Sequence, residues 1–278
     1  MTRTAKQALD ELSRPGPHEV LRGDLALVGM PGLVFTPRSG RGLPAVAFGH
    51  GWLQPVLRYR GLLRHLASWG IVAVAPATQT GPLPSHRLFA ADLSTALDIC
   101  TGVRLGDGDI TVSGDRLAVA GHSTGGGSAV LAASQDDRVR AVVTLAVAET
   151  HPSAVRAATQ CDMPGLHLAA GQDRVAPSVG HAEAVATAWA GPVQLRSLAK
   201  ASHLGFTESW HWSDLLLDGK PERATQRLGR ALMTGFLLRV LTRNRGYDAL
   251  LESDARGAAL TYQRTPRTPR GATSASRR

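Results

Sequence analysis

The five residues 121–125, with the sequence Gly-His-Ser-Thr-Gly, constrain the fold more than any other segment of the chain. They follow a short apolar run at 116–120 and precede a run of small and apolar residues at 126–133 that predicts a helix. A Gly-x-Ser-x-Gly segment between a strand and a helix is typical of a nucleophile elbow, a tight and strained turn that exposes the serine hydroxyl. The segment therefore predicts an α/β fold with Ser123 as a nucleophile.

Two later apolar runs are each followed by a residue that can activate such a serine. Residues 163–170 lead to Asp173, and residues 193–198 lead to His203. A serine hydroxyl needs a base to take its proton, and the base needs a carboxylate to orient it. Carboxyl ends of parallel strands meet at one edge of an open sheet, so the order serine, acid, histidine predicts a catalytic triad there. Asp162 is the rival acid, but it precedes its strand and is expected at the opposite edge.

Two backbone N–H groups are expected to form the oxyanion hole. One is the amide of Thr124, the residue after the nucleophile, and the other comes from a loop after an earlier strand. Residues 43–48 predict that strand, and the small-residue loop 49–52 follows it, so we assign the second donor to Trp52. His50 is expected to shape this loop by packing and hydrogen bonding rather than to transfer protons.

These motifs resemble those of the serine hydrolases of the α/β-hydrolase fold. More narrowly, the chain is similar to the dienelactone-hydrolase-like branch that includes the actinobacterial cutinases, and more distantly to chlorophyllase-type esterases. The resemblance is carried by residues 65–74, 116–127, 173–177 and 201–203, and it extends over about residues 15–252. It implies hydrolysis of carboxylic esters through an acyl-enzyme intermediate, with a small-molecule ester as substrate and neither a metal nor an organic cofactor.

The chain also differs from those cutinases near the expected site. Thr124 stands where they carry a methionine, and no tryptophan lies near residues 148–150, where they carry one that lines the cleft. Cys100 and Cys161 are the only cysteines, which gives no disulfide framework. The resemblance therefore implies ester cleavage more directly than polyester cleavage.

Three residues are candidates for contact with the substrate. Trp52 lies in the oxyanion loop, and His122 occupies the variable position of the elbow, where a packing or positioning role is expected rather than that of the base. Trp210 lies in extra sequence shortly after His203, beside His211 and Trp212. Its ring would either cover the cleft or anchor the inserted segment to the domain surface, and both alternatives stay open at this point.

The remaining organisation follows from pattern and composition. With 278 residues, of which 43% are hydrophobic and 19% charged, the chain suits one globular domain. Alternating strand-like and helix-like segments predict a mostly parallel sheet covered on both faces. The helices are expected at 59–68, 87–100, 126–134, 179–189 and 224–241.

Three segments divide the chain. Residues 1–14 form a polar segment with a helical pattern and no apolar core of a secretory signal, residues 15–252 form the hydrolase domain, and residues 253–278 form a basic tail. The formal net charge is +9, and residues 264–278 contain five arginines and no acid. Such a tail is expected to be disordered and solvated, and the lack of aromatic residues in 264–278 argues against nucleic-acid or membrane binding. Together with the two cysteines, these features predict a cytoplasmic enzyme.

Other functions remain open on the same residues. A thioesterase or an acyltransferase would use the same triad, because a fold does not fix the substrate. A non-catalytic ligand-binding or anion-binding protein is the third alternative. Metal chemistry is not expected, because the scattered histidines lack ligand spacing. The sequence gives no indication of the oligomeric state.

Overall fold

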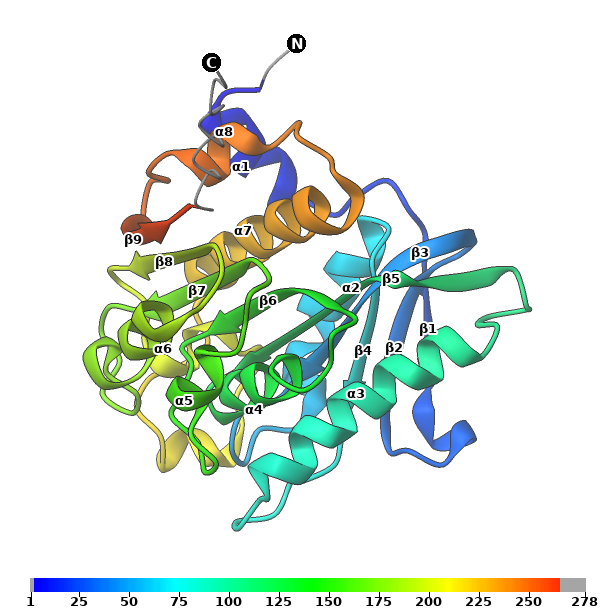
Figure 1. Cartoon of the computed structure of the whole chain (residues 1–278), viewed down its shortest axis with the longest axis horizontal. Coiled ribbons are helices and arrows are strands. Elements are labelled where there is room, and N and C mark those ends of the chain that lie inside the picture. The colour runs from blue at the N-terminus through cyan, green and yellow to red at the C-terminus, as the bar shows by residue number, and fades with distance from the viewer. Residues whose placement is uncertain (1–2, 266–278) are drawn as a thin grey trace, which may run out of the picture.

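One nine-stranded sheet forms the centre of the protein (Figure 1). The computed structural model describes residues 3–265, and every structural statement below refers to them. The strands are β1 (Val20–Asp24), β2 (Gly32–Pro37), β3 (Gly40–Gly49), β4 (Val72–Pro76), β5 (Ile110–His122), β6 (Val139–Leu145), β7 (Gly165–Ala170), β8 (Val193–Leu198) and β9 (Ala259–Arg264).

The strand order is β1-β2-β4-β3-β5-β6-β7-β8-β9. Pairing is parallel from β4 to β8, whereas the pairs β1–β2, β2–β4 and β8–β9 are antiparallel. The carboxyl ends of β3, β5, β7 and β8 therefore share one edge of the sheet. The predicted mostly parallel sheet of an α/β-hydrolase fold is confirmed.

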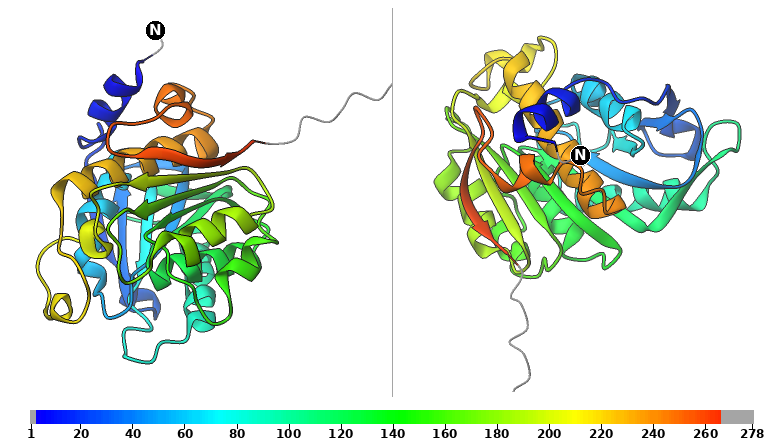
Figure 2. Two further views of the ribbon diagram at one scale, coloured as in Figure 1. Left: turned by 90° about the vertical axis from the view of Figure 1, so that its left-hand side faces the viewer. Right: turned by 90° about the horizontal axis from the view of Figure 1, so that it is seen from above.

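Helices cover both faces of the sheet (Figure 2). One face packs against α1 (Ala5–Leu12), α2 (Arg60–Ser68), α7 (Arg223–Thr242) and α8 (Asp248–Glu252), and the other against α3 (His86–Gly102), α4 (Thr124–Ala133), α5 (Ala154–Ala158) and α6 (Ala182–Ala188). All five predicted helices are present, with ends within three residues of the predicted ones.

Alternation along the central strands builds the two cores. In β3, Val46 and Phe48 pack in the core under α2 and α7, whereas Ala45 and Ala47 pack in the core under α3 and α4. Successive side chains of a strand point to opposite faces, so an almost continuous apolar run is buried on both sides. This burial fixes the register of the strands and hence the positions of the loops that follow them.

The C-terminal boundary differs from the prediction. A disordered tail from residue 253 onward is wrong for residues 259–264, because they form β9 and pair with β8 at the sheet edge. An unpaired edge leaves backbone N–H and C=O groups without partners, and β9 satisfies those of β8. The buried Arg196 guanidinium also donates hydrogen bonds to the Leu251 and Ser253 carbonyls, which ties down the preceding turn. Residues 266–278 of the predicted tail lie outside the described residues.

The N-terminal segment is helical, as its pattern predicts. Helix α1 buries Ala8 and Leu12 and packs against α7 and α8. Cys100 and Cys161 are both buried and unpaired, and burial raises the pKa of each thiol to about 12. Among the described helices, none has both the length and the apolar character that crossing a bilayer requires.

Candidate active site

Ser123 lies in a sharp turn between β5 and α4. Its backbone has φ 56° and ψ −127°, a conformation that residues other than glycine rarely adopt. The turn is held because the Ser123 N–H donates to the Leu145 carbonyl and the Ser123 carbonyl accepts from the Ala148 N–H. The strained backbone therefore projects the hydroxyl from the strand end, as a nucleophile elbow requires.

Two glycines allow this turn to pack closely. A Cβ atom on Gly121 would lie 2.3 Å from the Gly125 carbonyl oxygen, and one on Gly125 would lie 2.3 Å from the carbonyl oxygens of Gly49 and His50. Any side chain at either position would push α4 away from β3 and β5. The glycines thus bring the nucleophile next to the loop that follows β3.

Asp173, His203 and Ser123 form a continuous hydrogen-bonded chain. Asp173 follows β7, and His203 begins the short 3-10 helix η4 (His203–Phe206) after β8. The His203 Nδ1–H donates to Asp173 Oδ2 at 2.7 Å, and His203 Nε2 accepts from the Ser123 hydroxyl at 2.8 Å. This tautomer leaves Nε2 free to take the hydroxyl proton. The structure therefore brings together the three residues that the sequence assigns to the triad.

The second carboxylate oxygen of Asp173 is also fixed. Asp173 Oδ1 accepts hydrogen bonds from the backbone N–H groups of Val175 and Ala176, at 2.9 and 2.8 Å. Two amides on one oxygen and the imidazole on the other hold the carboxylate in one orientation. Asp162, the rival acid, is exposed before the amino end of β7 and is not part of this chain of hydrogen bonds.

Two backbone amides border the same cavity as the nucleophile and have no acceptor among the described residues. The N–H groups of Thr124 and Trp52 donate no hydrogen bond to any residue from 3 to 265. Both residues border a cavity of about 110 Å³ that Ser123 and His203 also border. The remaining lining residues are Gly51, Gln54, His122, Ala148, Val175, Leu204 and Leu217. This arrangement can stabilise an oxygen that becomes negative after attack by Ser123.

His122 and Tyr59 connect the oxyanion loop to the base. The Tyr59 hydroxyl accepts from the Gly51 N–H at 3.1 Å and donates to His122 Nδ1 at 2.8 Å. The His122 Nε2–H in turn donates to the His203 carbonyl at 2.9 Å. Burial, with a smaller effect of the nearby His203, holds the pKa of His122 well below its usual value. A neutral His122 is the form that can accept from Tyr59 and donate to His203.

Tyr59 is a positioning residue that the sequence pattern does not reveal. It lies 63 residues from His122 and appears as one more apolar position at the start of α2. His50 behaves as a structural residue of the same loop, with its ring nitrogens 2.9 Å from the Gly51 carbonyl and 2.8 Å from the Thr78 carbonyl.

The extra sequence after His203 forms one wall of the cavity through Leu217. It is held by the buried Arg58, whose guanidinium contacts both carboxylate oxygens of Asp214 at 2.6 and 3.0 Å and donates to the Ser209 carbonyl at 2.7 Å. The Arg58 and Asp214 side chains are only 2% and 6% exposed. A two-point contact between buried charges fixes both position and orientation.

Trp210 does not occupy the predicted place. Its side chain is 70% exposed and is not among the residues that line the cavity, and Trp212 is 50% exposed. Neither ring covers the cleft, and neither is buried against the domain as an anchor. The segment is instead anchored by the polar contacts of Arg58, and the assignment of Trp210 to substrate binding stays a prediction. Trp52 and His122, the other two candidates, do border the cavity.

Metal binding has no support from the geometry. In residues 3–265, no three His, Cys, Asp or Glu side chains are grouped so that they could hold a metal ion.

Comparison with known proteins gives consistent matches. Residues 16–207 match the family model described as "PETase: PET hydrolase-like". The chain is similar to Cutinase est1 of Thermobifida alba (28% identity, 62% of this chain, 57% of the relative) and to Cutinase 2 of Thermobifida cellulosilytica (29%, 61% and 64%). It is also 29% identical to Cutinase cut1 of Thermobifida fusca, over 61% of this chain and 53% of the relative.

The matched part of the chain thus spans between about half and two thirds of the length of these relatives. The family match covers the elbow with the Thr124 amide, the strand ends that carry the acid and the base, and the loop after β3 with the Trp52 amide. The chain belongs to the PET hydrolase-like family of α/β-hydrolases.

Proposed function

We propose that this protein hydrolyses carboxylic esters through an acyl-enzyme intermediate. The observation that carries the proposal is the buried chain of hydrogen bonds from Asp173 through His203 to Ser123, at 2.7 and 2.8 Å. It lies beside two backbone amides without partners in the described chain. Nucleophile, base, orienting acid and oxyanion donors are the components that acyl transfer needs.

The acylation step follows from these positions. Ser123 Oγ attacks the ester carbonyl carbon while His203 Nε2 takes the hydroxyl proton. The carbonyl oxygen becomes negative and accepts hydrogen bonds from the amides of Thr124 and Trp52. The carbon–oxygen bond to the alcohol then breaks, and His203 gives its proton to the departing alcohol.

Deacylation repeats the sequence with water. His203 removes a proton from a water molecule, the hydroxide attacks the acyl carbon, and the same amides hold the oxyanion. The bond to Ser123 Oγ breaks, the serine recovers a proton from His203, and the carboxylic acid leaves. Asp173 keeps the imidazole in the tautomer that both halves require and stabilises its cationic form.

The size of the cavity suggests the acyl group. At about 110 Å³ it is much smaller than the roughly 300–1,000 Å³ of typical ligand pockets, so it suits a short acyl chain next to Ser123. Ala148 and Leu217 form part of its wall. We propose small-molecule esters of short carboxylic acids as the substrate class. Cleavage of polyesters is a separate activity that this proposal does not include.

A labelling experiment tests the nucleophile. A fluorophosphonate probe is expected to modify Ser123 in the wild-type protein and to label neither Ser123→Ala nor wild-type protein pretreated with a serine-directed inhibitor. Ser134→Ala is the matched control, because its hydroxyl lies at the end of the same helix and donates to the Leu131 carbonyl. Labelling that persists in Ser123→Ala, or maps to another serine, would disprove the assignment.

A substrate series tests the reaction. Turnover of p-nitrophenyl acetate and butyrate is expected to exceed that of the octanoate and dodecanoate esters, and to be lost in Ser123→Ala. Faster turnover of an acyl thioester than of the matched ester would favour a thioesterase, and transfer to an added alcohol in preference to water would favour an acyltransferase.

A cytoplasmic location remains our proposal, and cell fractionation would test it.

A further inference from the structure

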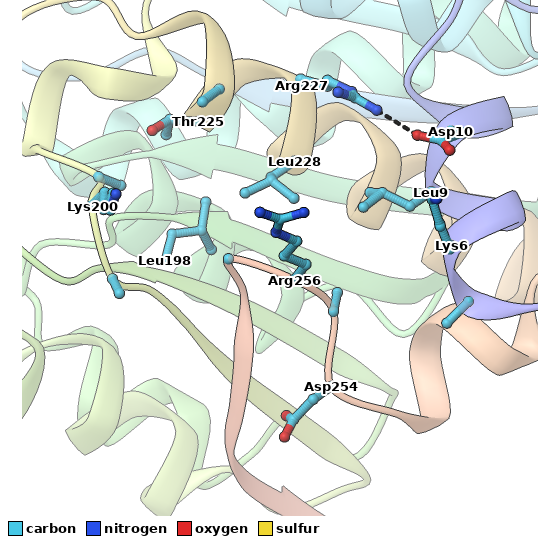
Figure 3. A pocket seen from close by; sticks show the side chains of 16 residues that line it. Lys6, Leu9, Asp10, Leu198, Lys200, Thr225, Arg227, Leu228, Asp254 and Arg256 are labelled. Atoms are coloured by element: carbon cyan, nitrogen blue, oxygen red, sulfur yellow. Dashed lines mark hydrogen bonds and ion pairs between the residues drawn. The ribbon is translucent and has the colours of Figure 1, made fainter.

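A second cavity, much larger than the catalytic one, lies between α1, α7, the end of β8 and the turn before β9 (Figure 3). Its volume is about 940 Å³, at the upper end of the range for small-molecule sites. Most of its wall comes from residues outside the segment 16–207 that the family model matches. The mechanism above uses none of its side chains.

The walls of this cavity are held by specific contacts. On one side, Arg227 of α7 pairs with Asp10 of α1 at 2.6 Å. On the other side, the buried Arg196 donates to the Leu251 and Ser253 carbonyls and so positions the turn 254–257. These contacts join α1 to α7 and the turn 254–257 to β8 at the border of the cavity.

The inner surface is mainly apolar. Leu9 of α1, Leu198 of β8 and Leu228 of α7 line the cavity, and Ala201 and Ala255 are also among its apolar lining residues. Leu198 is almost fully buried, whereas Leu9 and Leu228 are only partly buried against the core. Displacement of water from an apolar surface of this kind by an alkyl chain is favourable.

Cationic side chains surround this apolar surface. Lys6, Lys200, Arg227 and Arg256 line the cavity, and Figure 3 shows Arg256 between Lys200 on one side and Lys6 on the other. The lining also contains two carboxylates: Asp10 pairs with Arg227, and Asp254 accepts a hydrogen bond from the Leu260 N–H, so the four cations exceed the carboxylates by two. Lys6, Lys200 and Arg256 form no ion pair within residues 3–265.

We propose that this cavity binds a long-chain aliphatic monocarboxylate, with the alkyl chain against Leu9, Leu198 and Leu228 and the carboxylate near Arg256, which lies between Lys6 and Lys200. An apolar interior favours the chain, and three cations without partners favour an anionic head. The opposite amphiphile, with a cationic head, would be repelled. The proposal does not rest on ester hydrolysis, since binding here requires no step at Ser123.

Binding of sodium dodecanoate to the full chain, below its micelle concentration, tests the proposal by isothermal titration. One molecule per chain is expected to bind. Affinity should rise roughly fourfold for each methylene from octanoate to dodecanoate, as burial of apolar surface predicts. Dodecyltrimethylammonium, which has the same chain and a cationic head, should not bind.

Two variants locate the site. Ala224→Trp fills the cavity from α7 and should abolish binding, whereas Ala148→Trp fills the catalytic cavity and should leave it unchanged. The triple variant Lys6→Gln, Lys200→Gln, Arg256→Gln should weaken binding on the order of tenfold, since each exposed charge contact contributes modestly. Removing three exposed arginines elsewhere controls for net charge: Arg87→Gln, Arg104→Gln, Arg140→Gln.

The outcomes separate cleanly. Absence of binding to wild-type protein would overturn the proposal, as would binding lost in Ala148→Trp but retained in Ala224→Trp, because the acid would then occupy the catalytic cavity. Equal weakening by both triple variants would also overturn it. Thermal unfolding of each variant shows whether it is folded, and ester turnover by Ala224→Trp close to wild type would show that the loss is local.

Discussion

The triad loops and the segment after His203 both line the catalytic cavity, but they are positioned by different means. Ser123, Asp173 and His203 each follow a buried parallel strand, so the sheet itself brings them to one edge. The segment containing Leu217 follows no strand and is held by the Arg58–Asp214 contact, which joins residues 156 positions apart. The positions of the catalytic residues therefore depend on the sheet, whereas the shape of the acyl site depends on the buried Arg58–Asp214 ion pair.

The triad side of this comparison predicts the largest effect. Asp173→Asn should lower kcat by about 10⁴-fold, because an amide no longer selects the required imidazole tautomer. Steady-state kinetics with p-nitrophenyl acetate measures the loss. The matched variant Asp162→Asn, at the other end of the same strand, should retain wild-type kcat. Similar losses in both variants would remove Asp173 from the site.

The segment side predicts a loss of stability. Asp214→Asn leaves the buried Arg58 without a counter-charge and should reduce the free energy of unfolding by about 3–5 kcal/mol. Urea denaturation measures it. The control Glu252→Gln breaks an exposed pair with Arg239 and should cost below about 1 kcal/mol. Equal effects would show that Arg58 does not anchor the segment.

Lowering the pH should reduce the free energy of unfolding through His65, which lies in α2. Burial, and then the charge of Arg230, lower the pKa of His65 to about 4, from 6.5 when exposed. Between pH 6.5 and 4 the unfolded chain binds a proton that the folded chain does not, so stability falls as pH falls, by up to about 1.4 kcal/mol per pH unit. Urea midpoints from pH 7 to 4.5 should show a shallower decline in His65→Leu. The exposed His18→Leu should keep the wild-type slope.

A smaller effect on kcat is expected from Tyr59, which connects the oxyanion loop to His122. Tyr59→Phe removes the acceptor of the Gly51 N–H and the donor to His122. Loss of a buried hydrogen bond costs about 1–3 kcal/mol, so kcat should fall roughly tenfold with KM little changed. Tyr247→Phe, which removes a hydroxyl contact with Glu11 far from the site, should leave kcat unchanged. An equal fall in kcat for Tyr247→Phe would show that Tyr59 has no specific role in positioning the oxyanion loop.

The smallest effects distinguish residues within the segment. Leu217→Ala enlarges the acyl site and should raise kcat/KM for p-nitrophenyl octanoate relative to acetate by severalfold, since each buried methylene contributes about 0.8 kcal/mol. Trp210→Ala removes an exposed ring and should leave this ratio within about twofold of wild type. A larger change for Trp210→Ala than for Leu217→Ala would restore the tryptophan as part of the substrate site.

Local patterns explain what could be predicted. The elbow, the acid and the base are each recognisable because a strand, a glycine and a functional residue lie within a few positions of one another. The five helices are likewise predictable from runs of apolar and small residues. The edge strand β9 was not, because its short alternating pattern lies in a basic segment whose composition favours disorder, and only pairing with β8 stabilises it.

The sequence alone determined the α/β-hydrolase architecture and the three residues at the strand ends, because strand burial and local turn chemistry are encoded within short segments. Only the tertiary structure decided that Tyr59 joins His122 to the oxyanion loop and that Leu217, not Trp210, faces the cavity. It also decided where α1, α7 and the C-terminal turn enclose the second cavity. Such contacts join residues far apart in the chain, and their strength depends on burial that no local pattern specifies.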